Sequence, residues 1–402
     1  MTYRYFLKSI FTIALFAAIF SCNDLTGSDK KEKETDSLKT SDDTINLANY
    51  DRYFNDVARF YAGVKQLEGS TLQVTDTNAA WKRHHRDFTI FYDSIERTWF
   101  PPIVKFRNKE LYEANQEIKT LYYPFSGPDF VHADLFFPNA ENIIMIGLER
   151  VGDVPKLNDL SDARMDKFFK AVRISLDSIF TFGYFMTNDM SRDFTRSLEM
   201  RGVMPVIMIF LVRSGFNILD IQKVTINKQG KLIPSDPALD TDNSHDTYIS
   251  GMHIQYIKPG DQAVRNLYYF SHDMSDQSLA ATPEFLKFLE TLDINVTFLK
   301  AASYLCRTFS VIRNTALSRS QFILQSDTGI PIEHFSNNEW DLHFYGKYTR
   351  TIKCFKWCLQ PELKQIYQSN PNIKPLDFGI DYGCRFGESN LMIAKKKSGV
   401  NP

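Results

Sequence analysis

The chain has 402 residues, of which 43% are hydrophobic and 14% aromatic, and its formal net charge at pH 7 is −1. This length is sufficient for one large domain, or two ordinary domains, with a hydrophobic core. A nearly neutral chain has no basic footprint for nucleic acid, so we expect no nucleic-acid partner.

The first 22 residues, MTYRYFLKSIFTIALFAAIFSC, have the pattern of a signal peptide. Two basic residues precede an apolar stretch at 10–20, which is too short to cross a bilayer as a helix. The stretch ends in Ile19-Phe20-Ser21-Cys22, which resembles the lipobox of bacterial lipoproteins. The resemblance implies cleavage before Cys22, diacylglycerol on its thiol, and attachment to a membrane through that lipid. The alternative is an ordinary signal peptide with an incidental cysteine.

Residues 23–45 contain few apolar side chains, so they cannot bury enough surface to fold. We therefore expect a signal peptide at 1–21, and the lipidated Cys22 with a disordered tether at 22–45. A helical segment at 46–119 and an α/β body at 120–402 complete the expected organisation. The phenylalanine before Ser-Cys and the charged tether resemble the corresponding features of lipoproteins of the Bacteroidetes group. The expected location is the periplasmic or cell-surface side of a Gram-negative membrane.

Apolar residues recur every three or four positions in AAWKRHHRDFTIFYDSIERTW, at 79–99, which predicts one long helix with an apolar stripe. His85 falls on this stripe, whereas His84 faces elsewhere. Pro101 is expected to end the helix, and a second helical stretch follows.

From residue 121 the pattern becomes that of an α/β protein, with buried strands at 121–125 and 143–148. The later elements are expected in this order: a helix at 204–213, a strand and turn at 217–232, a hairpin around 259–260, helices at 283–292 and 310–319, a strand at 341–348, a helix at 361–368 and a closing hairpin at 378–394. Helices that alternate with strands predict the fold class: a helical N-terminal segment followed by a Rossmann-like or mixed-sheet α/β body.

The stretch from Leu121 to Glu149 has the order strand, loop, helix, strand, acid. It resembles the first motif of class I methyltransferases, in which a glycine loop approaches the cofactor and the acid binds ribose hydroxyls. The resemblance would give these roles to Gly127 and Glu149. The loop has one glycine where the family has two or three, and Pro124 lies in the first strand. S-adenosylmethionine and NAD are cytoplasmic, so no cofactor is expected on an exported body.

The string YPFSGPDF, at 123–130, places a phenol, a hydroxyl and a carboxylate around a tight turn: Tyr123, Ser126 and Asp129. It resembles the signature of a protein family to which no activity is assigned. Three further stretches look similar to that family: RGVMPVIMIFLVRSG, NLYYFSHDMSD and SDTGIPIEHF. We predict that this corner contacts a ligand. The alternative is a structural turn in which Asp129 or Ser126 caps the next helix.

Three other stretches contain acidic residues in patterns that resemble known sites. Asp327-Thr328-Gly329 resembles the triplet of aspartic proteases, but those enzymes need two such carboxylates, so we expect a turn. The loop at 240–246 alternates oxygen-bearing residues as calcium loops do, yet His245 replaces the expected glycine, so no metal site is expected. His272 stands beside Asp273, which is the order of a general base and its orienter.

Four cysteines follow Cys22: Cys306, Cys354, Cys358 and Cys384. An even number permits two disulfides outside the cytoplasm, but we expect buried free thiols.

Two functions stay open. The first is a lipid-anchored envelope protein that binds a ligand such as a glycan, or a protein partner, or maintains the envelope. The second is an enzyme on a Rossmann-like scaffold, either a degenerate methyltransferase-like transferase or a hydrolase built from Asp129, Glu149 and the His272 region.

Overall fold

The computed structural model describes residues 50–72, 78–154, 157, 165–173, 176, 202–235, 249–380 and 388–398. The lipobox with Cys22, the whole expected tether, the acidic loop at 240–246 and Cys384 lie outside the described residues. Residues 45–402 form one compact unit, so the helical segment and the α/β body are not separate units. Within the described residues, no helix combines the length and the apolar character needed to cross a membrane.

The described part of the helical segment contains four helices before the first strand, which agrees with the helical pattern of its sequence. They are α1 (Arg52–Tyr61), α2 (Ala79–Thr98), α3 (Phe100–Glu110) and α4 (Tyr112–Glu117). Side chains cap the first two, because Asp51 accepts a hydrogen bond from the Tyr53 N–H and Asn78 accepts one from the Trp81 N–H. Prolines occupy the first turn of α3, where their missing N–H groups leave no bond unmade, so a new helix begins where α2 ends.

We expected His85 on the apolar stripe of α2, but the buried histidine of the pair is His84. His84 is fully buried and stacks on Phe169, with ring centroids 4.1 Å apart. His85 is half-buried and stacks on Trp81. The periodicity of α2 could not show that Phe169, which lies far along the chain, covers the side on which His84 lies.

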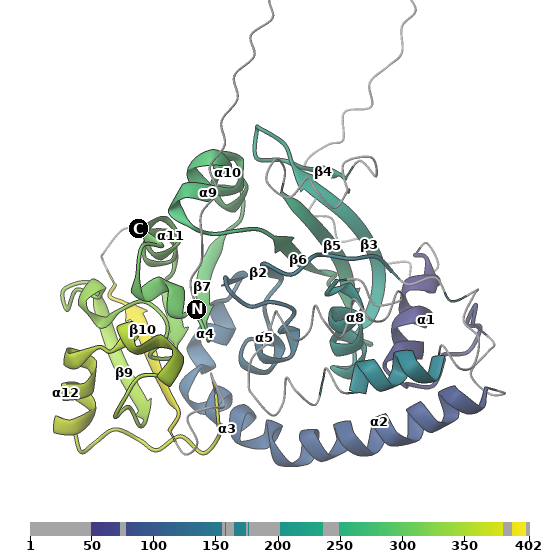
Figure 1. Cartoon of the computed structure of the whole chain (residues 1–402), viewed down its shortest axis with the longest axis horizontal. Coiled ribbons are helices and arrows are strands. Elements are labelled where there is room, and N and C mark those ends of the chain that lie inside the picture. The colour runs from purple at the N-terminus through teal and green to yellow at the C-terminus, as the bar shows by residue number, and fades with distance from the viewer. Residues whose placement is uncertain are drawn as a thin grey trace, which may run out of the picture. The chain divides into compact units, whose positions relative to one another are not determined.

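A ten-stranded mixed sheet forms the centre of the body, which confirms the predicted α/β fold (Figure 1). The strands are β1 (Thr120–Tyr123), β2 (Asn142–Gly147), β3 (Asn217–Ile226), β4 (Leu232–Pro234), β5 (Ser250–Ile257), β6 (Arg265–Ser271), β7 (Ile294–Leu299), β8 (Phe322–Gln325), β9 (Trp340–Gly346) and β10 (Asn390–Lys396). Their order is β4-β3-β5-β6-β2-β1-β7-β8-β10-β9. The five strands β6, β2, β1, β7 and β8 run parallel, and the other pairs are antiparallel.

Helices cover both faces of the sheet, and those that follow β1 in the chain have the following bounds. They are α5 (Phe130–Phe136), α8 (Met204–Arg213), α9 (Asp276–Ala281), α10 (Pro283–Glu290), α11 (Ser310–Arg319) and α12 (Pro361–Ser369), with short 3-10 helices η4 (Ser303–Cys306), η5 (Ile332–His334) and η6 (Lys353–Cys358). The helices expected at 204–213 and 310–319 are therefore confirmed with the same bounds. The hairpin expected around 259–260 is formed by β5 and β6.

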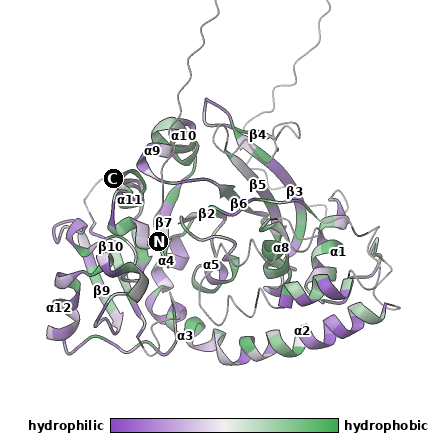
Figure 2. Ribbon diagram, viewed as in Figure 1, coloured by the Kyte–Doolittle hydropathy of each residue, from purple (hydrophilic) through white to green (hydrophobic). Residues whose placement is uncertain are grey.

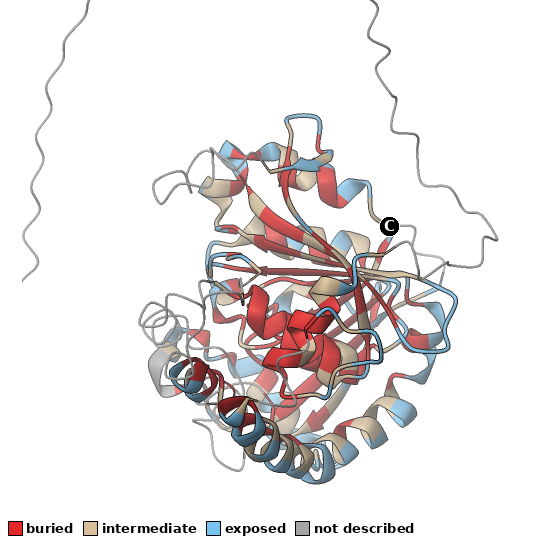
Figure 3. Ribbon diagram, turned by 90° about the vertical axis from the view of Figure 1, so that its right-hand side faces the viewer, coloured by how far each residue is buried: buried red, intermediate tan, exposed pale blue. Residues whose placement is uncertain are grey.

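Two hydrophobic cores lie on opposite faces of the sheet, and the parallel strands contribute to both. Leu121 and Tyr123 pack into the core that contains α1, α2, α5 and α8, whereas Tyr122 packs into the core that contains α9, α10 and α11. This alternation explains why the central strands are continuous apolar runs in the sequence. Figure 2 shows hydrophobic residues along these strands, and Figure 3 shows the same strands as buried.

The expected closing hairpin at 378–394 is wrong. Strand β10 lies between β8 and β9 and pairs antiparallel with both. Its residues Leu391 and Ile393 enter one core, and Met392 and Ala394 enter the other. A strand that is buried on both faces is stable inside the sheet, whereas a terminal hairpin would expose one of these faces.

Candidate functional site

The order of the sheet reverses beside β1. Strand β2 follows β1 in the chain and lies on one side of it, while β7 lies on its other side and continues to β8. In open α/β sheets, ligands bind outside the carboxyl ends of the two strands at such a switch point. Lys300 follows β7 directly, and Asp129 is the N-cap of α5, the helix that follows β1. Charged residues that follow β1 and β7 in the chain therefore meet at this edge of the sheet.

Four polar side chains form a buried cluster at the switch point, which we call the Asp129 cluster: Tyr123, Asp129, His132 and Lys300. Lys300 Nζ lies 2.5 Å from Asp129 Oδ2, and the hydroxyl of Tyr123 donates to the same oxygen at 2.8 Å. His132 Nδ1 lies 2.7 Å from Asp129 Oδ1 and 3.1 Å from Lys300 Nζ. All four residues are buried, so the charges are compensated inside the protein.

Burial alone would raise the pKa of Asp129, but the charges of protonated His132 and of Lys300, with the hydrogen bonds from both, hold that pKa below its usual range. Burial lowers the pKa of His132, which is therefore neutral near pH 7. An ionised carboxylate only accepts hydrogen bonds, so Nδ1 of His132 carries the ring proton. Its Nε2 is then a bare acceptor, and this buried atom has no hydrogen-bond partner among the described residues.

This Asp–His pair has the geometry of a general base and the group that orients it. The rings of Trp99 and Phe136 lie beside the imidazole. The four residues of the cluster are at most 3% exposed, so the cluster is closed to solvent in this structure.

The glycine corner is bonded to the adjacent strand. The Ile146 N–H donates to Ser126 Oγ at 3.1 Å, and the Gly127 N–H donates to the Ile146 carbonyl at 3.3 Å. A Cβ added to Gly147 would lie 3.0 Å from Gly127 Cα, so the loop packs tightly on the end of β2. The Gly127 N–H is thus used within the protein. Asp129 accepts from the His132 N–H and caps α5, so a carboxylate already occupies the place where a phosphate would bind.

The remaining predicted ligand contact, Glu149, lies beside the glycine corner, because a Cβ added to Gly147 would meet both Glu149 Oε2 and Gly127 Cα. Glu149 follows β2, and both its carbonyl and its Oε2 accept from the Tyr269 hydroxyl, at 2.9 and 3.3 Å. The structure therefore brings together Tyr123 and Asp129, bonds Ser126 and Gly127 to β2, and places Glu149 against β6. The role of these five residues as ligand contacts stays a prediction.

The other acidic candidates are bonded elsewhere. His272 Nε2 lies 3.0 Å from the Thr282 hydroxyl, while the Asp273 carboxylate accepts from the N–H and hydroxyl of Ser275. Asp327 is buried and accepts from the Asn390 side chain at 2.8 Å, which connects the turn after β8 to β10. Asp327 is part of a turn, as expected. Within the residues that the structure describes, no group of three metal-ligating side chains is close enough to hold a metal ion.

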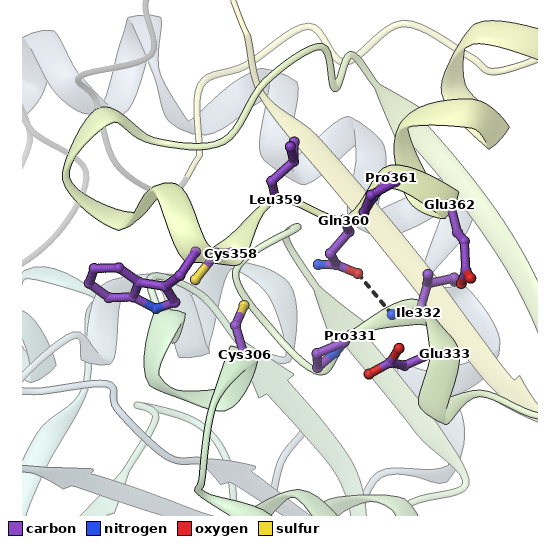
Figure 4. A pocket seen from close by; sticks show the side chains of 10 residues that line it. Cys306, Pro331, Ile332, Glu333, Cys358, Leu359, Gln360, Pro361 and Glu362 are labelled. Atoms are coloured by element: carbon purple, nitrogen blue, oxygen red, sulfur yellow. Dashed lines mark hydrogen bonds between the residues drawn. The ribbon is translucent and has the colours of Figure 1, made fainter.

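A cavity of about 230 Å³ lies on the carboxyl side of β7 and β8 (Figure 4). Its walls come from η4, η5, the end of η6 and the start of α12. The lining residues are Cys306, Pro331, Ile332, Glu333, Trp357, Cys358, Leu359, Gln360, Pro361 and Glu362. Trp357 and Leu359 are 43% and 46% exposed, so the cavity has an apolar rim that opens to solvent.

Gln360 holds the cavity walls together. Its side-chain oxygen accepts from the Ile332 N–H at 2.8 Å, and its amide nitrogen donates to the Asp327 carbonyl at 2.7 Å. Its own N–H donates to the Tyr348 hydroxyl at 3.1 Å. Since these bonds satisfy the buried amide, the cavity is preformed.

No family model matches the chain, and no curated protein or solved structure is significantly similar to it.

Sequence reasoning missed Lys300, His132 and the whole cavity lining. Lys300 was detectable, because a lysine directly after a buried strand is a conspicuous charge in the run INVTFLK. The string KWCLQ places exposed apolar residues on either side of a buried cysteine, which was a local signal for part of the cavity.

Proposed function

We propose that the protein is a lipid-anchored protein of the cell envelope that binds a small hydroxylated ligand, such as one residue of a glycan, in the cavity of Figure 4. The observation that carries this proposal is the cavity itself. It combines an exposed indole ring with a preformed polar wall. Aromatic ring faces pack against the C–H groups of sugars, and carboxylates accept hydrogen bonds from hydroxyls.

The charge of the cavity supports the class of ligand. Glu333 and Glu362 are exposed and lie on the same side of the cavity (Figure 4). Two carboxylates repel phosphate and favour neutral polyhydroxy or cationic groups. The volume is below the roughly 300–1,000 Å³ of pockets for drug-sized ligands, which favours a single sugar ring over a dinucleotide.

The envelope location rests on the sequence of the first 22 residues. The order of basic residues, apolar stretch and Ile19-Phe20-Ser21-Cys22 supports lipidation at Cys22. The polar residues that follow would then separate the body from the membrane surface.

Ligand titrations on the full-length chain in detergent test the binding proposal. Tryptophan emission and the thermal midpoint would be followed with mono- and oligosaccharides. The indole of Trp357 is far more exposed than those of Trp81 and Trp340, so a sugar that stacks on it should shift the emission. Trp357→Ala should weaken binding at least tenfold. Tyr112→Ala, which removes a still more exposed ring outside the cavity, should leave it unchanged. Saturable binding that Trp357→Ala leaves intact would move the ligand away from this cavity, and no binding by any sugar would refute the glycan proposal.

The second candidate is an enzyme on a Rossmann-like scaffold. The order β6-β2-β1-β7-β8 supports it, because this is the strand order of the first five strands of a dinucleotide-binding fold. Strand β10 lies next to the edge strand β9 and runs antiparallel to both of its neighbours, β8 and β9. This antiparallel strand is a further resemblance to class I methyltransferases. The loop at Ser126 and Gly127 is already hydrogen-bonded to β2, and Asp129 already caps α5. Both observations favour the binding function. Thermal shift with S-adenosylmethionine and NAD distinguishes the two, because a shift that Glu149→Gln abolishes would support the enzyme.

A further inference from the structure

Two cysteines from separate segments meet at the cavity. Cys306 is the last residue of η4, and Cys358 is the last residue of η6. Neither is in a disulfide in this structure, and both line the cavity. Figure 4 shows their sulfur atoms pointing toward one another. The side chains are close enough for a hydrogen bond between them.

Neighbouring contacts hold η4 and η6 in register around this pair. The guanidinium of Arg307 lies over the ring of Trp357, with Cζ 4.0 Å from the centroid. The Cys358 thiol donates to the Ser303 carbonyl at 3.2 Å. Each cysteine is therefore flanked by a residue that contacts the opposite segment.

The two thiols differ in the properties that thiol–disulfide exchange requires. The hydrogen bond from Cys306 lowers the pKa of the Cys358 thiol, although burial acts in the opposite direction. A lower pKa increases the fraction of thiolate, which is the attacking species. Cys306 is the more accessible of the two, since it is half-buried whereas Cys358 is buried.

We propose that Cys306 and Cys358 are a redox-active pair that closes to a disulfide by exchange with a small disulfide of the glutathione type. The Cys306 sulfur attacks one sulfur of the oxidant, which forms a mixed disulfide and releases one thiol. The Cys358 thiolate then attacks the Cys306 sulfur, which forms the protein disulfide and releases the second thiol. Two electrons pass from the cysteines to the oxidant, and their two protons leave with the released thiols.

The disulfide would connect η4 to η6 across a loop of about 50 residues, which restricts the unfolded chain. We expect the oxidised protein to unfold about 5–10 °C higher than the reduced protein. The bond would also fix the cavity wall that carries Trp357, and this consequence rests on the proposed ligand site. The redox chemistry itself does not depend on that function.

Mass spectrometry of the full-length chain tests the proposal. The native protein would be equilibrated with oxidised or reduced glutathione, alkylated and digested. We expect a peptide that links Cys306 to Cys358 only in the oxidised sample, and the same peptide in Cys354→Ser and Cys384→Ser variants. Cys306→Ser and Cys358→Ser should each abolish the link and the thermal shift. Full alkylation of both thiols after oxidation, or a link from Cys358 to Cys354 or Cys384, would overturn it. Sugar binding is read separately by fluorescence, so either proposal can fail alone.

Discussion

Lys300 Nζ lies 2.5 Å from Asp129 Oδ2, and both side chains are at most 3% exposed. The two residues belong to loops that leave adjacent parallel strands at the switch point of the sheet. This buried ion pair, with Tyr123 and His132 bonded to the same carboxylate, connects β1, α5 and β7.

Removal of one partner of this pair should destabilise the protein strongly. Lys300→Met or Asp129→Asn leaves the opposite charge buried and uncompensated, which typically costs about 3–5 kcal/mol. Denaturant unfolding of the full-length chain measures the loss. Glu141→Gln, which breaks the exposed pair of Glu141 and Lys119, is the control and should have little effect. If Lys300→Met unfolds at the wild-type midpoint, the pair does not hold the fold together.

His84 should make the protein less stable in acid. Burial lowers its pKa to about 3, whereas the unfolded side chain titrates near 6.5. Between these values the unfolded state binds the extra proton, so this contribution to stability is present above about pH 6.5 and is lost as the pH falls toward 3. His84→Gln cannot take up the proton. The difference in unfolding free energy between wild type and variant should therefore shrink from pH 7.5 to pH 4.5. A constant difference would contradict this assignment.

Asp134 should make the protein less stable as the pH rises, which is the opposite of the effect of His84. Burial raises its pKa to about 6, although Arg265, Lys258 and Arg107 counteract the rise. The folded state holds the proton more tightly, so this contribution is present below about pH 4 and is lost as the pH rises through 6. Asp134→Asn mimics the protonated acid and should raise the thermal midpoint at pH 7.5 more than at pH 4.5. An equal change at both values would show that Asp134 titrates normally.

Cys22→Ser should release the protein from the membrane. The substitution removes the thiol that the lipobox resemblance assigns to the lipid. Metabolic labelling with a palmitate analogue and fractionation of cells check this expectation. Wild-type protein should carry label and sediment with membranes, and Cys22→Ser should lose the label. Cys384→Ser serves as the control because it leaves the lipobox unchanged. An unlabelled wild-type chain would favour an ordinary signal peptide.

The elements of secondary structure were largely predictable, because each depends on residues that are near in sequence. The helix Met204–Arg213 begins with Met204-Pro205, which suits a first turn, and Gly215 adopts φ +85° just beyond its end. The strands β1 and β2 are apolar runs because both of their faces are buried. The change from helices to alternating strands and helices near residue 120 follows from the same local periodicities.

The sequence by itself thus determined the class of fold and the approximate positions of many helices and strands, since local propensity and periodicity specify these. The tertiary structure alone decided the position of β10, the burial of His84 in place of His85, and the contact of Lys300 with Asp129. It also brought Cys306 to Cys358 and formed the cavity from η4, η5, η6 and α12. These features join residues far apart in the chain, and only the packing of both cores on one sheet fixes such distances.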